Sequence, residues 1–440
     1  MHRRALLLLL PSLGIARASP SRQDEARLEW SEPVELARGQ GVRGPWQQND
    51  SRYDFVDDPA VALAADGTAV VAWVDQARKA VLVQRRRADG RAESDPVLVA
   101  GQPEAFSWLP RLALAPDAPG SACVLWQEIV FSGGSHGGEM LLARSEDGGR
   151  SFAAPIDLSS SRGGDGKGRV TPDIWHNGSY DLLAATQGRV WAAWTEYDGP
   201  LWLARSQDGG RSFDRPQRVA GGRGEPPARA PSLALADDGA LLLAWTQGDD
   251  PAADVHVARA PDGARFGAPV RVKRSEGYSD APRLAVDGAG VVHLAWGESE
   301  GAPFRRQRIL HARSRDGGLS FEAPRAITPT LLRPFVSAGY PSLGVDARGR
   351  VYVLAELQDD VRQRPRGLGL AVSLDGGEHF LPTALVPHSR DPQGGFNGSS
   401  QGLLIPKLAV HADGELAIVN SALREGSHSR VWLLRGRMRA

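Results

Sequence analysis

Cysteine is nearly absent from this sequence of 440 residues, which contains only Cys123. A single thiol excludes an intramolecular disulfide framework and a metal cluster built on cysteine ligands. Cys123 lies in the apolar run 123–126, and this context favours the role of a small buried side chain.

An excess of charge of one sign is also missing. Lysine plus arginine and aspartate plus glutamate each number 52, so the formal net charge is zero. No long-range field therefore attracts nucleic acid or an anionic membrane surface, and we expect neither as a partner. The 51 glycines and 31 prolines are spread over turn positions, which favours many short strands over disorder.

Long apolar runs are missing after the first residues, so we predict no transmembrane helix. The N-terminus has Arg3 and Arg4, a short apolar run and the sequence Ala16-Arg17-Ala18. This pattern predicts a signal peptide over residues 1–18 that is cleaved before Ser19. We expect the mature chain, residues 19–440, to be secreted or periplasmic and to be a monomer.

What the sequence does have is a repeated phrase of the form Ser-x-Asp-Gly-Gly followed by an aromatic residue. It occurs at 145–152, 206–213, 314–321 and 373–380, with a shortened copy at 262–266. Each copy follows an alternating apolar run, which is typical of a β-hairpin. The aspartate can accept bonds from N–H groups that the turn leaves unpaired, and the glycines adopt positive φ. We therefore predict structural roles for Asp147, Asp208, Asp262, Asp316 and Asp375.

A unit of four strands can be written around this phrase. The first strand begins at a proline, the second ends in a tryptophan, the third leads into the phrase and the fourth follows it. The first strands are predicted to start near 59, 110, 172, 231, 282, 341 and 406, which gives units 51 to 65 residues apart. Proline is tolerated there because the innermost strand has an unpaired edge.

The two ends of the chain complement each other. Residues 30–36 have the pattern of a fourth strand, whereas residues 406–435 supply only the first three strands of a unit. We predict that residues 29–37 pair antiparallel with residues 430–435 and so close a ring. The mature chain is then one all-β domain, a β-propeller of four-stranded antiparallel blades, with seven blades predicted and six as the alternative.

The repeated phrase resembles the Asp-box, or BNR repeat, of sialidases and related β-propellers. The resemblance covers most of the mature chain as architecture. It implies the propeller fold more strongly than a function, because Asp-boxes occur in many propellers that are not sialidases. Sialidases are six-bladed rings, so the predicted count of seven departs from that family.

The candidate site lies at the end of the ring opposite the repeated phrase, where the loops are longer and richer in aromatic and charged residues. Trp108 and Trp175 are candidates for stacking on a ligand. The residues after the first-strand prolines include Arg111, Asp173, Arg283 and Lys407. The three cations suit a carboxylate, sulfate or phosphate, or they pair with Asp173 and nearby acids. On the first interpretation, the double change Arg111→Ala and Arg283→Ala abolishes binding of acidic glycans and leaves the fold intact.

A second regularity follows the tryptophans. Trp73, Trp126, Trp194 and Trp296 are each followed two residues later by an acid, namely Asp75, Glu128, Glu196 and Glu298. A spacing of two puts tryptophan and acid on the same side of a strand. The acids are either a ring of carboxylates around a polar pocket or rim acids satisfied by arginines and backbone N–H groups.

The resemblance to sialidases also implies catalytic residues. The phrase 340–343 resembles the segment that carries the sialidase nucleophile, so Tyr340 is the candidate nucleophile, with Glu298 or Glu196 as its partner. Asp57 or Asp58 would be the acid, and Arg111 and Arg283 would belong to a substituted anion site. The arginine of the family's Arg-Ile-Pro phrase is missing, because the first blade opens with 57–59 as Asp-Asp-Pro. The alternative role of Tyr340 is a loop aromatic packed on a proline.

Two functions from different classes follow. One is a propeller that binds a glycan or a protein at its axial face without catalysis. The other is an exo-α-sialidase-type glycoside hydrolase with a tyrosine nucleophile and a carboxylate acid/base. We predict no cofactor and no obligatory metal. Asp50, Asp54, Asp57 and Asp58 could supply oxygen ligands to calcium, but their spacing matches no EF-hand loop, and the alternative is that they are solvated loop acids.

Overall fold

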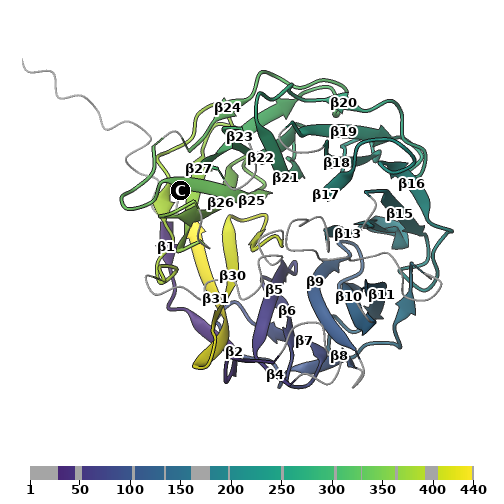
Figure 1. Ribbon diagram of the computed structural model, residues 1–440, viewed down its shortest axis with the longest axis vertical. Coiled ribbons are helices and arrows are strands. Elements are labelled where there is room, and N and C mark those ends of the chain that lie inside the picture. The colour runs from purple at the N-terminus through teal and green to yellow at the C-terminus, as the bar shows by residue number, and fades with distance from the viewer. Residues whose placement is uncertain are drawn as a thin grey trace, which may run out of the picture.

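Seven sheets surround a common axis in the computed structural model of the protein (Figure 1). The structure describes residues 28–44, 52–101, 105–132, 135–159, 179–196, 199–248, 252–301, 305–328, 330–361, 365–391 and 405–438. The predicted signal peptide, Asp50, Asp173 and Trp175 lie outside these ranges. Among the described residues, no helix has the length and apolar character needed to cross a membrane.

Each sheet is one blade of four antiparallel strands, which we name A to D from the axis outward. Blade 1 contains β5 (Val56–Leu63), β6 (Ala69–Asp75), β7 (Ala80–Arg86) and β8 (Val97–Gly101). Blade 2 contains β9 (Phe106–Leu114), β10 (Ala122–Ser132), β11 (Ser135–Ser145) and β12 (Ile156–Asp157). Blade 3 contains β13 (Tyr180–Ala184), β14 (Val190–Thr195), β15 (Leu201–Ser206) and β16 (Gln217–Ala220). A 3₁₀ turn, η2 (Thr186–Gly188), joins β13 to β14.

Blades 4 to 6 repeat the arrangement. Blade 4 contains β17 (Ala228–Leu235), β18 (Leu241–Gln247), β19 (Asp254–Ala260) and β20 (Val270–Arg271). Blade 5 contains β21 (Tyr278–Val286), β22 (Val292–Ser299), β23 (Gln307–Ser314) and β24 (Arg325–Ala326). Blade 6 contains β25 (Ser337–Val345), β26 (Val351–Gln358), β27 (Gly367–Ser373) and β28 (Ala384–Leu385). The all-β, seven-bladed propeller predicted from the sequence is thereby confirmed.

The seventh blade joins the two ends of the described chain. It contains β29 (Leu408–Val410), β30 (Glu415–Arg424) and β31 (His428–Met438), and its outer strand is split into β1 (Leu28–Trp30) and β2 (Val34–Gly39). Trp30 pairs with Gly436 and Val34 pairs with Leu433, both antiparallel. The predicted closure by an N-terminal strand is therefore confirmed. The short pair β3 (Val42–Arg43) and β4 (Tyr53–Asp54) then leads into blade 1.

The antiparallel order places all A–B and C–D turns at one end of the ring, the turn end, and all B–C and D–A connections at the other, the loop end. Hydrogen bonds between turns agree with this, because Gly148 N donates to Gly120 O over 2.7 Å and Gln187 N donates to Asp117 Oδ2 over 2.7 Å. The repeated phrase lies at the turn end.

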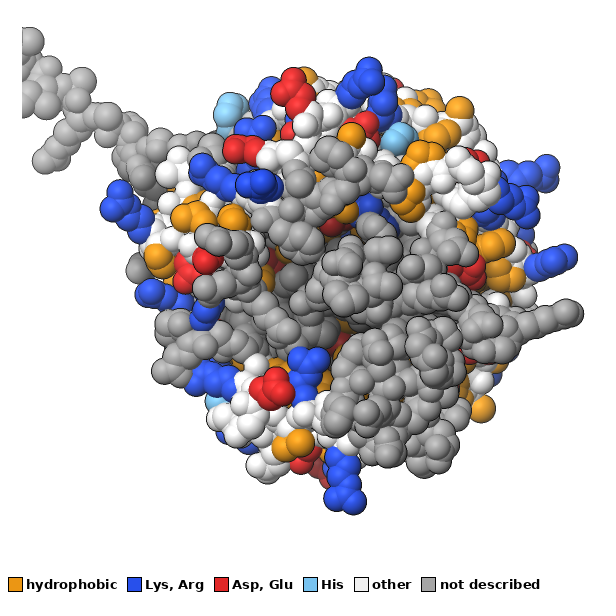
Figure 2. Space-filling model, viewed as in Figure 1, with side chains coloured by type: hydrophobic (Ala, Val, Ile, Leu, Met, Phe, Trp, Pro, Cys, Tyr) orange, Lys and Arg blue, Asp and Glu red, His pale blue; other side chains and the backbone are white. Residues whose placement is uncertain are grey.

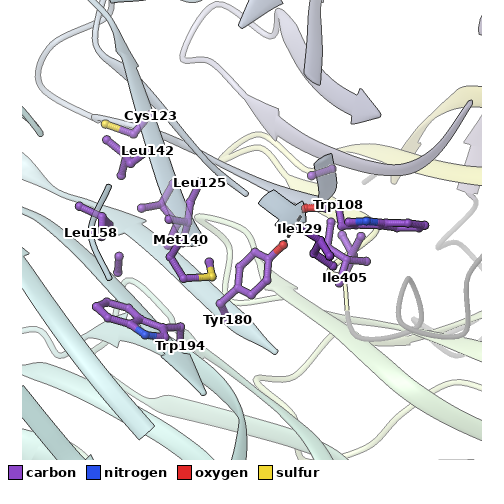
Figure 3. Packing of buried hydrophobic residues seen from close by; sticks show 14 of the residues in the cluster. Trp108, Cys123, Leu125, Ile129, Met140, Leu142, Leu158, Tyr180, Trp194 and Ile405 are labelled. Atoms are coloured by element: carbon purple, nitrogen blue, oxygen red, sulfur yellow. Dashed lines mark hydrogen bonds between the residues drawn. The ribbon is translucent and has the colours of Figure 1, made fainter. Parts of the chain in front are cut away.

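The tryptophans at the ends of the B strands pack between blades. Trp73, Trp126, Trp194, Trp245 and Trp296 are at most 1% exposed. Each joins an apolar cluster with the preceding blade, as Trp194 does with Leu125, Met140 and Leu142 of blade 2 (Figure 3). The alternating pattern of each strand is satisfied in this way, since one face meets the blade before it and the other face meets the blade after it.

The innermost strands share an irregularity just before their proline. A β-bulge shifts the pairing register of five A strands there. The residue that precedes the proline has a φ of 50–52° in each case, at Asp58, Leu109, Ala230, Ala281 and Tyr340. Residues before proline normally adopt extended backbone, and positive φ is costly for a residue with a Cβ atom. The structure thus holds a ring of strained backbone near the axis, and such strain is common at ligand sites.

The aspartates of the repeated phrase organise the turns. Asp208 Oδ1 accepts the N–H groups of Arg211 and Ser212 over 3.0 and 2.9 Å, and its Oδ2 accepts the Ser212 hydroxyl over 2.6 Å. Ser206 Oγ donates to Asp208 and accepts Gly210 N–H over 3.0 Å. Burial alone would raise the pKa of Asp208, but these hydrogen bonds outweigh it and lower the pKa to about 2. Equivalent bonds to turn N–H groups occur at Asp147, Asp262, Asp316 and Asp375.

Substitution of Asp208 by alanine is expected to lower the free energy of unfolding by about 1–3 kcal/mol, because the N–H groups of the turn lose their acceptor. Thermal or urea unfolding measures this change, and Asp214→Ala, which alters an acid just beyond the same turn, is the matched control. Ligand binding at the loop end should be preserved. A variant with wild-type stability, or one that binds no ligand although it is folded, would contradict the assignment.

Two histidines stack between the B and C strands of blade 5. The His293 and His311 rings lie 5.4 Å apart, His293 Nδ1 is 3.2 Å from His311 Nε2, and His293 Nε2 is 3.3 Å from Asp287. Phe380, which follows strand C of blade 6, makes a T-shaped contact with the His311 ring at 5.1 Å. Burial and the neighbouring His293 lower the pKa of His311 from 6.5 to about 3. The positive charges of Arg313 and Arg325 also lower the pKa of His311.

This depressed pKa predicts a loss of stability in acid. The unfolded chain binds a proton at His311 below pH 6.5 and the folded chain does not until about pH 3, so stability is full above 6.5 and falls between these values. From pH 7 to pH 5, the contribution is about 2 kcal/mol. We expect His311→Gln to flatten the curve of unfolding free energy against pH by this amount. Parallel curves for variant and wild type would rule out the assignment.

Candidate functional site

The inner tier of the loop end is built from the residues that follow the A-strand bulges. In the register of the blades these are Ala60, Arg111, Asp181, Ser232, Arg283, Ser342 and Lys407. The register gives Asp181 the place in blade 3 that the sequence analysis assigned to Asp173, because β13 begins at Tyr180, beyond Pro172. Polar members of this tier bind the next blade: Leu233 N donates to Asp181, Leu284 N to Ser232 and Lys407 N to Ser342, over 2.8–3.0 Å.

Arg111 and Arg283 are buried between carboxylates. They are 3% and 5% exposed, and Arg111 donates to the Tyr180 carbonyl over 2.9 Å. Asp181 acts on both arginines, with Asp58 next to Arg111 and Asp280 next to Arg283. Burial lowers the pKa of Arg283 to about 10 against the pull of these acids, and burial raises the pKa of Asp181 in spite of both arginines. These opposite charges from blades 1, 2, 3 and 5 act on one another near the axis, and we call the set the compensated belt.

Lys407 and Glu356 form a buried ion pair between blades 7 and 6. Their side chains are 3% and 2% exposed, and Lys407 Nζ donates to Glu356 Oε1. Glu356 lies on β26, opposite Gly339. Lys407, one of the three cations proposed for an anion, is thus engaged by a carboxylate of the chain itself.

Asp57 and Asp58 lie inside strand β5 and are 0% and 1% exposed. Asp57 accepts the Ser421 hydroxyl of blade 7, and Asp58 Oδ2 is 3.4 Å from Leu109 N of blade 2. Neither residue is a solvated loop acid; both tie blade 1 to its neighbours. In the part of the chain that the structure describes, no group of three or more His, Cys, Asp or Glu residues could hold a metal ion.

Tyr340 occupies the strained position of blade 6 and is partly exposed. Gly339 precedes it, and a Cβ atom there would overlap the Gln307 side chain, which explains why the bulge has glycine in this place. Burial raises the pKa of Tyr340, the charges of Asp280 and Glu356 raise it further, and Arg229 lowers it. The acids that act on Tyr340 are therefore Asp280 and Glu356. No hydrogen bond of the Tyr340 hydroxyl is found among the described residues.

Arg229 comes from the bulge of blade 4 and is 3% exposed. Its Nε lies 3.4 Å from Asp280 Oδ1, its Nη1 donates to Gly248 O over 3.4 Å, and the guanidinium carbon lies 4.4 Å from the centre of the Tyr278 ring. Its Nη2 is buried and has no hydrogen-bond partner among the described residues. A guanidinium that is fixed on one side and has an unused donor on the other is suited to an anionic or hydroxyl group of a ligand.

Three other predicted site residues are held by contacts within the chain. Glu298 binds Lys273 and lies 3.9 Å from Arg308, with Ser279 Oγ 3.5 Å from its second oxygen. Glu196 ends strand B of blade 3, where its carbonyl accepts Gly199 N–H over 3.0 Å. Trp108 is 2% exposed and packs against Phe55, Tyr180 and Ile405 in a cluster that joins blades 1, 2, 3 and 7 (Figure 3).

The sequence analysis placed residues 278–280 among the candidate loops but assigned no role to Asp280, Arg229 or Glu356. Arg229 and Asp280 stand two residues before their prolines, a position that the sequence analysis used only at Asp57 and Trp108. Glu356 follows Ala355, which replaces the usual tryptophan of strand B, so the pattern gave no marker there. A search for charged residues just before, and not only just after, each A-strand proline would have found the first two.

No family model matches the chain, and no curated protein matches its sequence. Solved propeller structures are similar at low identity. An ulvan lyase bound to a GlcA–Rha3S unit matches with a TM-score of 0.55 and 11% identity, over 93% of this chain and 98% of its own. The lectin BP39L from Burkholderia pseudomallei matches with a TM-score of 0.53 and 14% identity, over 74% and 84%.

A sialidase from Trypanosoma rangeli matches with a TM-score of 0.45 and 12% identity, over 74% of this chain and 57% of its own. At these identities, the ulvan lyase and the lectin show the fold and nothing more. This chain therefore shares its architecture with a polysaccharide lyase and a lectin.

Proposed function

We propose that the protein is an exported propeller that binds a glycan at its loop end, with the ligand placed at Tyr340 and Arg229. The single observation that supports this most directly is the buried Nη2 of Arg229, which has no hydrogen-bond partner in the described part of the chain and belongs to a guanidinium whose charge acts on Tyr340, a partly exposed tyrosine on strained backbone. Structural neighbours that bind or cleave carbohydrate support the same class of ligand. Export rests on the signal-peptide pattern of residues 1–18.

Within this proposal, Arg229 takes the role that the sequence analysis gave to Arg111 and Arg283. Those two arginines lie among Asp58, Asp181 and Asp280, whose charges already compensate theirs. Arg229 forms an ion pair with Asp280 at 3.4 Å, and its Nη2 is left without a hydrogen-bond partner among the described residues. An acidic sugar is therefore the ligand that we propose, with its anionic group on Arg229 and a hydroxyl on Tyr340.

A glycan array that carries sialylated, uronate-containing, sulfated and neutral glycans tests the proposal. We expect wild type to bind acidic glycans, and we expect Arg229→Lys, which keeps the charge but loses the planar fork, to bind them about tenfold more weakly. Arg265→Lys, at a side chain that is 90% exposed on blade 4, is the matched control. Wild type that binds no glycan, or an Arg229→Lys profile equal to that of the control, would refute the proposal.

The second candidate function is a glycoside hydrolase that uses Tyr340 as its nucleophile. The observation in its favour is that the charges of Asp280 and Glu356 both act on Tyr340, and these carboxylates are the proposed acid/base groups. Assays with a fluorogenic sialoside and a panel of other aryl glycosides decide between the two functions. Turnover that is abolished by Tyr340→Phe would favour the enzyme, and binding without turnover would favour the lectin-like function.

A further inference from the structure

The loop end of blade 5 carries polar side chains from the axis to the outer surface. At the axis, Asp280 pairs with Arg229. The preceding residue, Ser279, pairs in register with Glu298 on the next strand, and its hydroxyl is 3.5 Å from Glu298 Oε2. Gly297, next to Glu298, has no side chain to interrupt this line. A polar path thus leads outward from Arg229 through Ser279 to Glu298.

Glu298 holds two cations at the outer end of this path. It is 5% exposed, and its Oε1 binds Lys273 Nζ and lies 3.9 Å from Arg308 Nη2. The Lys273 and Arg308 side chains are 33% and 48% exposed, so both extend from the buried carboxylate to the solvent. Two like charges that would repel each other are held together at the surface by one buried acid.

Two segments, 271–274 and 305–308, meet here and form the blade 5 basic surface. The two segments carry six cations, namely Arg271, Lys273, Arg274, Arg305, Arg306 and Arg308. Lys273 and Arg308 meet at Glu298, Arg271 pairs with Asp254, and Arg306 donates to the Val336 carbonyl; Glu276 and Glu300 lie a few residues away along the chain. Asp254 and Glu298 are already engaged in ion pairs. Arg274 and Arg305 are exposed, with no ion pair among the described residues. On the face seen in Figure 2, basic and acidic side chains are interspersed around the rim.

We infer that this surface binds an extended anionic polysaccharide whose chain runs from the axis over blade 5. The inference rests on the proposed function for the unit at Arg229 and adds that the ligand is a polymer. Five of the six cations are arginines, whose forked donors match carboxylate and sulfate groups. Because the net charge of the chain is zero, no overall electrostatic field attracts polyanions. Binding of a polyanion therefore depends on the local excess of positive charge in the blade 5 basic surface.

The test compares two triple variants of the full-length protein. Arg274→Ala, Arg305→Ala and Arg308→Ala together remove half of the surface. Arg78→Ala, Arg91→Ala and Arg265→Ala remove the same charge from side chains that are 68%, 82% and 90% exposed on blades 1 and 4. Labelled polygalacturonate and dextran sulfate distinguish carboxylate from sulfate, and neutral dextran is the control ligand. Phosphatidylserine vesicles and single-stranded DNA serve as other polyanions.

We expect the first variant to bind polygalacturonate or dextran sulfate about tenfold more weakly than the second, at equal melting temperature and with a smaller dependence on salt. Equal affinities of the two variants, no binding of either polymer by wild type, or equally tight binding of vesicles or DNA would overturn the inference. Binding of a digalacturonate distinguishes this inference from the proposed function. If Arg229→Lys binds the disaccharide as wild type does, while the blade 5 triple variant no longer binds the polymer, the proposed site at Arg229 is wrong and the inferred polysaccharide surface is supported.

Discussion

Replacement of Arg283 by alanine is expected to lower the free energy of unfolding by about 3–5 kcal/mol, because it leaves buried carboxylates without their counter-charge. Arg283 is 5% exposed and lies among Asp181, Asp280 and Arg111. Asp181 also accepts the Leu233 N–H of blade 4 over 2.8 Å, so an uncompensated charge there weakens the contact between two blades. The double change with Arg111→Ala, proposed from the sequence as harmless to the fold, is expected to be more severe still.

Urea unfolding of Arg283→Ala measures the effect, and Arg271→Ala, at an exposed side chain of blade 4, is the matched control. The combination Arg283→Met with Asp181→Leu provides a sharper test. Removing both charges relieves the uncompensated Asp181, but Leu233 N–H loses its acceptor and Arg111 loses an acidic neighbour, so this double variant should recover part of the lost stability. If Arg283→Ala is as stable as the control, the arginine is not part of a compensated belt and its role as a ligand contact is open again.

The fold was predictable because its signals are local. The phrase that ends at Phe213 needs only its own side chains to form a turn, and the missing strand at each end of the chain identified the closure by residues 29–37. Alternation along each strand defines two faces without any knowledge of the neighbours. Seven such units, counted from proline and tryptophan, therefore gave the architecture and the number of blades.

The site was harder to predict because it depends on contacts between blades. Arg111 and Arg229 both lie within two residues of a strand proline, and nothing in their own segments shows that Asp58 and Asp181 of other blades act on the first or that Asp280 of the next blade pairs with the second. The start of blade 3 was also assigned wrongly, at residue 172, because Tyr180 occupies the position that proline has in the other blades and Asp181 follows it. Counting back from Trp194, with which Tyr180 pairs, would have corrected the assignment.

Deletion of residues 28–39 is expected to prevent the ring from closing. The segment contributes Leu28 and Trp30 to the core between blades 6 and 7 and Leu36 to the core between blades 7 and 1. These side chains are partly buried, and each stabilises the fold by about 1–2 kcal/mol. Ser31 adds two bonds to Arg435, one from its N–H over 2.9 Å and one to its hydroxyl over 3.2 Å. The deletion also exposes the edge of β31, where other chains can pair.

We therefore expect the deleted protein to lose on the order of 3–6 kcal/mol of stability and to form oligomers. Melting curves and gel filtration measure both effects. Trp30→Ala should show a smaller loss without oligomers, because β1 and β2 can still cover the edge, and Glu32→Ala, at a side chain that is 90% exposed, is the control with no expected change. Arg435 provides a second contact between the blades at the ring closure, because its Nη1 in blade 7 donates to the Gly67 carbonyl of blade 1 over 3.0 Å. If the deleted protein is a monomer with the wild-type melting temperature, contacts between blades 7 and 1 such as the Arg435–Gly67 bond close the ring, and the N-terminal strand is not needed for closure.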